Sequence, residues 1–158
     1  MNPEVPDRRT DDRTDDRPAD ARRGRPLSDE DYAALRSFRH ALRVFLRASE
    51  RAARDAGVTP AQHQLLLAVR GHRGAGRPNV TDVAEALQLR HHSTVELIDR
   101  ATDAGLVVRH RAQDDQRRQE IELTRAGHDV LERLSVFHRD ELRRFRVEMI
   151  DILDELDR

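Results

Sequence analysis

The chain has 158 residues, with 29 basic side chains, 30 acidic side chains and a formal charge of -1, and every base is an arginine. This length fits one domain plus a tail, and the absence of cysteine excludes disulfides, thiolate metal sites and thiol-based redox sensing. No apolar run approaches the ~18 residues of a membrane span, and no hydrophobic signal core is present, so we expect a cytoplasmic protein.

Residues 1–26 are predicted to form a disordered, charged tail. They hold seven acidic and seven basic side chains but few apolar ones, too few to offset the entropy of ordering. The tail ends in Arg22-Arg23-Gly24-Arg25-Pro26, which resembles the Arg-Gly-Arg-Pro core of an AT-hook, an arm that enters the minor groove of A·T-rich DNA. At this point the Arg23–Pro26 arm is either a DNA contact or a basic linker.

The segment 27–57 is predicted to be a helix that begins at Ser28 and ends at Gly57. Ser28 is followed three residues later by Asp31, a pattern typical of an N-cap, and the acidic first turn suits the helix dipole. Apolar or small residues then recur at spacings of three and four, namely Leu35, Phe38, Leu42, Phe45, Ser49 and Ala52. This pattern predicts one buried stripe packed against partner helices.

Three further helices are predicted between residues 59 and 103. Thr59-Pro60-Ala61-Gln62 combines an N-cap, a proline at the first helical position and a capping-box glutamine, and the apolar run 65–69 predicts a helix buried on nearly all sides. After a glycine-rich loop at 71–78, Thr81 is the expected N-cap of a short helix. Another helix is expected from about His91 to Asp103, and two short helices in succession predict a helix-turn-helix.

A two-stranded hairpin and a long helix are predicted to complete the chain. The strands are Leu106–Val108 and a return in which Ile121 and Leu123 face inward, around a charged loop at 112–118. Thr124 is the expected cap of the last helix, whose apolar seam is Leu131, Leu134, His138, Leu142, Phe145, Met149, Ile152 or Leu153, and Leu156. The expected fold is mainly α with a two-stranded β wing: a winged helix-turn-helix at 59–124, flanked by helices at 27–57 and 125–158.

Short motifs in the right order and spacing resemble those of the MarR family of bacterial transcription regulators, over about residues 28–158. They are Thr59-Pro60-Ala61-Gln62, Leu87-x-Leu89, Ile98-Asp99-Arg100, Ala104-Gly105-Leu106-Val107, Asp115-x-Arg117, Leu123-Thr124 and Gly127. The resemblance implies a homodimer whose terminal helices interlock and whose two winged domains bind successive major grooves of palindromic double-stranded DNA. It also implies a regulator, expected to be a repressor, that a small-molecule effector releases from DNA.

In this resemblance the helix from His91 is the recognition helix. Its periodicity predicts that Thr94, Leu97, Ile98 and Ala101 pack inward, which leaves His91, His92, Ser93, Val95 and Glu96 to face the major groove. Arg90 departs from the family pattern, because a side chain that can accept a hydrogen bond usually caps this helix, and we expect Arg90 to bind a phosphate instead. Alternatively, His91 and His92 only solvate or cap the turn.

In the wing, the resemblance implies that Arg117 enters the minor groove while Asp115 steadies the loop. Arg109, Arg111 and Arg118 are expected to contact flanking phosphates, since residues 109–118 hold four arginines against two aspartates. The alternative is a solvated turn. Asp99 and Arg100 are expected to form an ion pair on the inner side of the recognition helix that ties it to the wing.

The resemblance implies a small aromatic acid as effector, bound between the terminal helices and the winged domain. His40, Arg43, His63 and Arg70 are the polar residues expected to line that crevice, and the alternative is that they are ordinary surface side chains. The histidines lack metal-site spacing, so no metal or cofactor is expected, and no enzyme motif stands out. The competing function is a winged-helix module that binds another protein, which the near-neutral charge favours.

Overall fold

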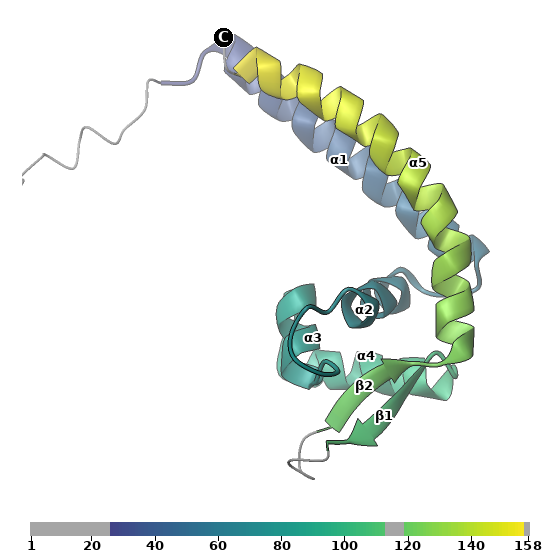
Figure 1. Cartoon of the computed structure of the whole chain (residues 1–158). Helices are drawn as coiled ribbons and strands as arrows, with labels where there is room; N and C mark the ends of the chain where they lie inside the picture. The colour runs from purple at the N-terminus through teal and green to yellow at the C-terminus, as the bar shows by residue number, and fades with distance from the viewer. Residues whose placement is uncertain (1–25, 113–118, 157–158) are drawn as a thin grey trace, which may run out of the picture.

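The fold is known from a computed structural model, which describes residues 26–112 and 119–156 (Figure 1). Its elements are α1 (Asp29–Asp55), α2 (Pro60–Arg70), α3 (Val80–Leu87), α4 (His91–Asp103), β1 (Val107–Arg111), β2 (Gln119–Leu123) and α5 (Arg125–Leu156). This order confirms the predicted fold class, mainly helical with a two-stranded wing. None of the described helices combines the length and apolar character needed to cross a membrane.

Local capping signals set the first two helix starts. The Ser28 hydroxyl accepts a hydrogen bond from the Asp31 N–H at 3.2 Å, and the Asp31 carboxylate accepts from the Ser28 N–H at 2.7 Å. Thr59 and Gln62 form the same reciprocal box at the start of α2. Both starts were predicted correctly because a capping box depends only on residues three apart.

The start of α3 differs from the prediction. Its cap is Asn79, whose Oδ1 accepts from the N–H groups of Thr81 at 2.7 Å and Asp82 at 3.2 Å. The prediction that Thr81 is the cap is therefore wrong, because Thr81 lies inside the first turn. The helix ends at Leu87. Its C-cap is Gln88, a non-glycine residue in the left-handed region with φ of 54°, and this tight turn leads into α4.

The two strands form an antiparallel wing whose base is fixed to the helical body. Val107 pairs with Leu123 and Arg111 with Gln119. Ile121 and Leu123 are buried as predicted. The Ile121 N–H also donates to the Pro78 carbonyl at 2.8 Å. The loop before α3 is thereby held against the free edge of β2.

The main core lies inside the winged segment and at the roots of the long helices. Its buried apolar residues include Leu65 and Leu66 of α2, Ile98 of α4 and Ile121 of β2. The expectation that α2 is buried on nearly all sides is wrong for Leu67, which is 44% exposed. Helix α2 therefore has one open face.

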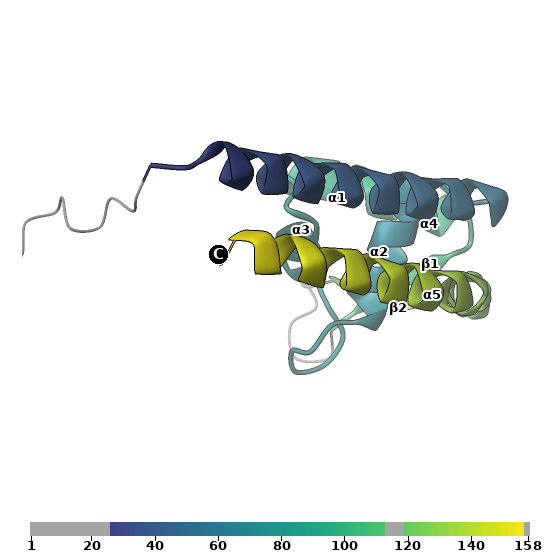
Figure 2. The ribbon, with the colours of Figure 1, turned by 90° about the horizontal axis from the view of Figure 1, so that it is seen from above.

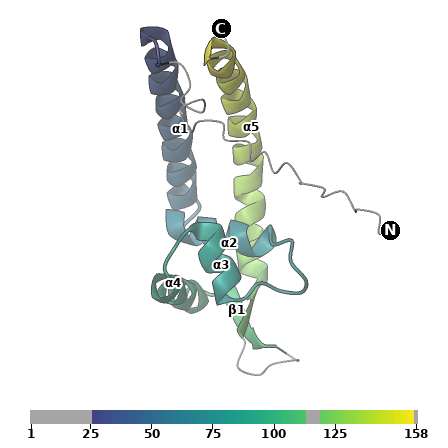
Figure 3. The same cartoon turned by 90° about the vertical axis from the view of Figure 1, so that its left-hand side faces the viewer.

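Helices α1 and α5 form a long antiparallel arm that projects from the winged segment (Figures 1, 2 and 3). The stripe of α1 that faces α5 contains Ala34 and Ala41, with Phe38 packed beside them. In α1, the predicted seam residues that are at least partly buried are Phe38, Phe45, Ser49 and Ala52. In α5, the buried seam residues are Leu131, Leu134 and Ile152, and the partly buried ones are His138, Phe145 and Met149. The predicted positions Leu35, Leu42, Leu142 and Leu153 are instead exposed within the chain. Each long helix thus has a second, open apolar side.

Candidate nucleic-acid interface

Helix α4 presents one buried face and one open face. Thr94, Leu97, Ile98 and Ala101 are buried, as the periodicity predicted. The Thr94 hydroxyl donates to the Arg90 carbonyl at 3.1 Å, so it serves the helix itself.

The open face holds the residues predicted to face the major groove. His91, His92 and Glu96 are exposed, and Ser93 and Val95 are partly exposed. Ser93 Oγ lies 3.3 Å from His92 Nε2, so these two polar groups form a hydrogen-bonded pair that is accessible from outside. The surface offers the donors, acceptors and methyl groups that base edges recognise.

The first turn of α4 has no side-chain cap. Arg90 occupies the N-cap position with an exposed side chain and makes no capping hydrogen bond. Because the helical ladder begins with the Thr94 N–H, the three preceding N–H groups have no acceptor inside the helix. Free N–H groups, the positive end of the helix dipole and the Arg90 guanidinium together suit an anionic oxygen at this point.

An ion pair links the recognition helix to the wing, but not through the residues expected. Arg109 of β1 contacts the Asp99 carboxylate at 2.6 Å and donates to the Val95 carbonyl at 3.4 Å. The Asp99–Arg100 pairing is therefore wrong: Arg100 is exposed and lies 3.9 Å from Glu96 on the outer side. The predicted phosphate contact of Arg109 stays a prediction, and its charge is already partly neutralised.

The tip of the wing lies outside the described residues. Asp115, Arg117 and Arg118 belong to this tip. The Arg22–Arg25 part of the N-terminal arm also lies outside the described residues. Arg111 is described, exposed and at the tip end of β1. Of the arginines predicted to contact DNA from the wing, the structure therefore describes Arg109, which is engaged with Asp99, and Arg111.

On the other edge of the wing, Glu122 joins two basic side chains. Its carboxylate lies 3.0 Å from Arg77 of the α2–α3 loop and 2.8 Å from His110 of β1. His110 is thus engaged within the wing and does not gather with His91 and His92. Across residues 26–112 and 119–156, no group of three metal-ligating side chains comes together.

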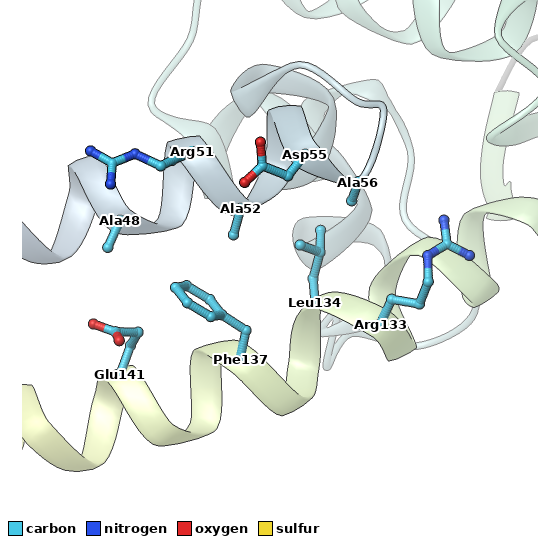
Figure 4. A pocket seen from close by; sticks show the side chains of 9 residues that line it. All are labelled: Ala48, Arg51, Ala52, Asp55, Ala56, Arg133, Leu134, Phe137 and Glu141. Atoms are coloured by element: carbon cyan, nitrogen blue, oxygen red, sulfur yellow. The ribbon is translucent and has the colours of Figure 1, made fainter.

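A pocket of about 570 Å³ lies between α1 and α5, close to the winged segment (Figure 4). Phe137 projects from α5 toward Ala48 and Ala52 of α1, and the rim includes Arg51 and Arg133. None of the four predicted effector residues lines this pocket. His40 and Arg43 are exposed on α1, Arg70 borders a different hollow beside β2, and His63 is buried.

His63 and His138 form a polar contact behind this pocket that the sequence pattern did not reveal. Their rings stack with centroids 4.6 Å apart, and Phe137 meets the His138 ring edge-on. Burial, and secondarily the neighbouring His138, lowers the pKa of His63 from 6.5 to about 4. His63 is therefore neutral at physiological pH.

The Ser49 hydroxyl lies 2.7 Å from His138 Nε2, which raises the question of a catalytic pair. Nδ1 of the same ring faces the Leu134 carbonyl at 2.7 Å rather than a carboxylate. Ser49 is itself buried. An enclosed hydroxyl without an acidic third partner on the ring is better suited to joining helices than to attacking a substrate.

Comparisons with known proteins agree with this geometry. Residues 56–118 match the model of the MarR family. Among solved structures, AbsC from Streptomyces coelicolor, a MarR family transcriptional regulator, superposes with a TM-score of 0.67 at 24% identity, over 84% of this chain and 90% of that one. The MepR–DNA complex from S. aureus gives a TM-score of 0.62 at 20% identity, over 78% and 85% of the two chains. A search of curated proteins found no significant match.

A further solved structure, CouR from Rhodococcus jostii RHA1 bound to p-coumaroyl-CoA, has a TM-score of 0.56 at 24% identity, over 64% of this chain and 69% of that one. At these identities the superpositions establish the fold, which includes the helix-turn-helix, the wing and the long terminal helices. The family model covers the segment that contains the recognition helix. That segment matches the MarR family model, and the fold around it is the winged helix-turn-helix fold of solved MarR family transcription regulators.

Proposed function

We propose that the chain is a homodimeric, sequence-specific DNA-binding regulator, acting as a repressor, that a small acidic effector releases from its operator. The observation that carries this proposal is the open face of α4, where an uncapped positive helix end, Arg90 and two exposed histidines stand together. A recognition helix in the major groove uses such a face. The role is one of binding, without enzymatic activity.

The open apolar sides of the long helices support the dimer. Exposed large apolar side chains follow α1 and α5, namely Leu35, Leu42, Val44, Leu46, Val136, Leu142, Val147, Ile150 and Leu153. Exposed large apolar side chains repeated along two neighbouring helices are typical of an interface. A second copy of the same chain would cover it, because a two-fold interface brings identical apolar stripes together.

The contact between α4 and β1 supports a binding mode in which the helix and the wing approach DNA together. Asp99 and Arg109 hold β1 against α4, so the wing would approach DNA together with the helix. MepR has been solved on DNA and on an oligodeoxyribonucleotide. For this chain we infer the same kind of ligand, with α4 in the major groove and Arg117 in the minor groove.

The pocket between α1 and α5 supports the effector. Its apolar floor at Phe137 and Leu134 suits a ring, and Arg51 and Arg133 offer cations for an acid group. CouR was solved with p-coumaroyl-CoA, and BpsR from Bordetella bronchiseptica is regulated in DNA binding by 6-hydroxynicotinic acid. We infer an aromatic acid as the chemical class for this pocket.

The test is selection of bound duplexes from a random-sequence pool, followed by fluorescence anisotropy on the selected site. Neutralising ~6 to 10 phosphates predicts a fall in affinity of several decades between 50 and 200 mM salt. Enrichment of an inverted repeat, with half-sites about one helical turn apart, supports the proposal. No enrichment together with a flat salt response would support a protein-binding module instead.

Substitutions in the wing distinguish a loss of DNA contact from a loss of folding stability. Arg117→Ala should weaken binding at least tenfold with the thermal midpoint unchanged, whereas Arg139→Ala, an exposed arginine of α5, should leave affinity unchanged. Equal affinity of Arg117→Ala and wild type would remove the wing from the interface. Deletion of residues 1–26 tests the arm in the same assay, with loss of affinity expected only for A·T-flanked sites.

The histidines at the start of α4 predict a pH response. Protonated imidazoles attract phosphate, so binding should be tighter at pH 6 than at pH 8. Replacing both His91 and His92 by glutamine should remove this gain in affinity at pH 6. An unchanged pH response in the double variant would show that these two side chains are not at the interface.

A further inference from the structure

His63 is a buried polar residue held at the junction of three helices. It lies on α2 with 1% of its surface exposed, stacked at 4.6 Å on His138 of α5. Its Nε2 is buried and makes no hydrogen bond with any described residue. Buried polar atoms are normally paired, so an unpaired ring nitrogen at this position requires an explanation.

The partner ring is fully hydrogen-bonded in either protonation state. Nδ1 of His138 faces the Leu134 carbonyl, which can only accept, so this nitrogen carries the hydrogen. Its Nε2 faces the Ser49 hydroxyl, which accepts or donates as required. A proton on His138 therefore keeps both of its hydrogen bonds, whereas a proton on His63 Nε2 finds no acceptor.

Other ionisable groups around the pair are directed elsewhere. On α1, Glu50 and Arg54 pair with each other at 3.2 Å on the exposed side, and on α2 the only other ionisable residue is Arg70. The charged residues of the adjoining pocket are Arg51, Asp55, Arg133 and Glu141. Burial and then His138 account for the lowered pKa of His63. Burial and the neighbouring His138 ring are therefore what disfavours a proton on His63.

We propose that the His63–His138 stack is a proton-binding site that couples the packing of α2 against α1 and α5 to pH. A proton on His63 would bury a charge against a second imidazole and without a hydrogen-bond acceptor. Moving α2 away from the long helices hydrates that ring. A proton therefore binds His63 more tightly in a displaced state, in which the winged segment has moved away from α1 and α5. Acid should favour that state.

The size of the effect follows from linkage. His63 takes a proton with a pKa of about 4 when packed and 6.5 when hydrated. Acidification from pH 7.5 to 5.5 should therefore weaken the packing equilibrium about tenfold. The consequence for an operator rests on the proposed function, since displaced winged segments would no longer match two half-sites, but the packing itself is measurable without DNA.

The experiment measures hydrogen-exchange protection of α2 at pH 7.5 and 5.5 in the full chain, corrected for intrinsic exchange. In the wild type, protection should fall about tenfold on acidification. His63→Phe retains a ring for the stack but binds no proton, and should show no such fall. His63→Leu is the second variant if the larger ring disturbs packing, and His128→Gln, which removes an exposed histidine of α5, should behave as wild type.

Each outcome is decisive. Constant wild-type protection, or an equal fall in the wild type and both His63 variants, overturns the proposal. A second readout is the imidazole titration of His63 by nuclear magnetic resonance, where an ordinary midpoint near 6.5 also overturns it. A fall confined to chains that keep His63 supports it even if no duplex is bound, which separates its failure from that of the DNA-binding proposal.

Discussion

The Asp99–Arg109 bridge should couple the recognition helix to the wing, and a double-mutant cycle measures this coupling. The perturbations are Asp99→Asn, Arg109→Gln and the double variant. They keep similar volumes and remove one charge at a time. The matched control is the same cycle on Glu96 and Arg100, one turn of α4 away.

The geometry of the two pairs sets the expected magnitudes. Asp99 and Arg109 are 2.6 Å apart, with side chains 53% and 26% exposed. Exposed ion pairs contribute ~0.2 to 1 kcal/mol, and partial burial with a short contact places this bridge near the upper end, at about 1 kcal/mol. Glu96 and Arg100 are 3.9 Å apart and mostly exposed, so their coupling should be about 0.3 kcal/mol or less.

The assay is urea unfolding at one fixed protein concentration, at 0.05 and 0.5 M salt. A coupling near 1 kcal/mol that changes little with salt, beside a control coupling that vanishes, is the expected result. A bridge coupling no larger than the control would refute the inference that the ion pair fixes the wing to the helix. Hydrogen exchange in β1 locates the effect, because loss of the bridge should loosen that strand first.

Three further substitution tests concern the fold. Gly127→Ala should lower the free energy of unfolding by about 2 to 3 kcal/mol, because a Cβ at this position would lie 2.2 Å from the Leu106 carbonyl oxygen. Gly105→Ala should lower it by about 1 kcal/mol, because Gly105 has a φ of 69° but open space around it. Equal losses by thermal denaturation would contradict the close contact at Gly127. Asn79→Ala should cost about 1 kcal/mol and Thr81→Ala under about 0.3 kcal/mol; the reverse order in urea unfolding would restore Thr81 as the cap. Because the folded pKa of His63 lies below 6.5, the unfolded chain binds more protons, and the free energy of unfolding decreases as the pH is lowered from 6.5 to about 4. Between pH 7 and pH 5 the wild type should lose about 2 kcal/mol more of this free energy than His63→Phe. Equal losses in the two proteins would contradict the lowered pKa.

Local signals allowed most of the fold to be predicted. The capping boxes at Ser28 and Thr59 and the inward face of α4 depend on residues three or four apart, which share one helix turn. The cap of α3 was missed because Asn79 and Thr81 are both good caps and lie two residues apart. The backbone path into the helix decides between them, and the Pro78 contact with β2 fixes that path.

The candidate site was predictable only where one helix supplies it. His91, His92 and Glu96 follow from the period of α4, but the Asp99–Arg109 bridge depends on how β1 crosses that helix. The pocket at Phe137 depends likewise on the distance between α1 and α5. In α1 the periodicity favoured one stripe containing Leu35 and Leu42, whereas small residues such as Ala34 and Ala41 form the inward stripe and permit closer helix packing.

Ion pairs hold the elements of the winged segment together, and a stack of two histidines lies where that segment meets the long arm. Asp99 with Arg109 on one edge of the wing, and Glu122 with Arg77 on the other, bind β1, β2, α4 and the α2–α3 loop together. At the junction with the long arm, His63 of α2 stacks on His138 of α5, and the Ser49 hydroxyl of α1 lies 2.7 Å from Nε2 of the same His138 ring. Phe137 touches His138 and also lines the pocket between α1 and α5, so an acid in that pocket and a proton on the stack would act on the same contact. If both proposals hold, affinity for the acid should differ between pH 7.5 and 5.5 in the wild type and not in His63→Phe, because two ligands that bias one equilibrium are linked reciprocally.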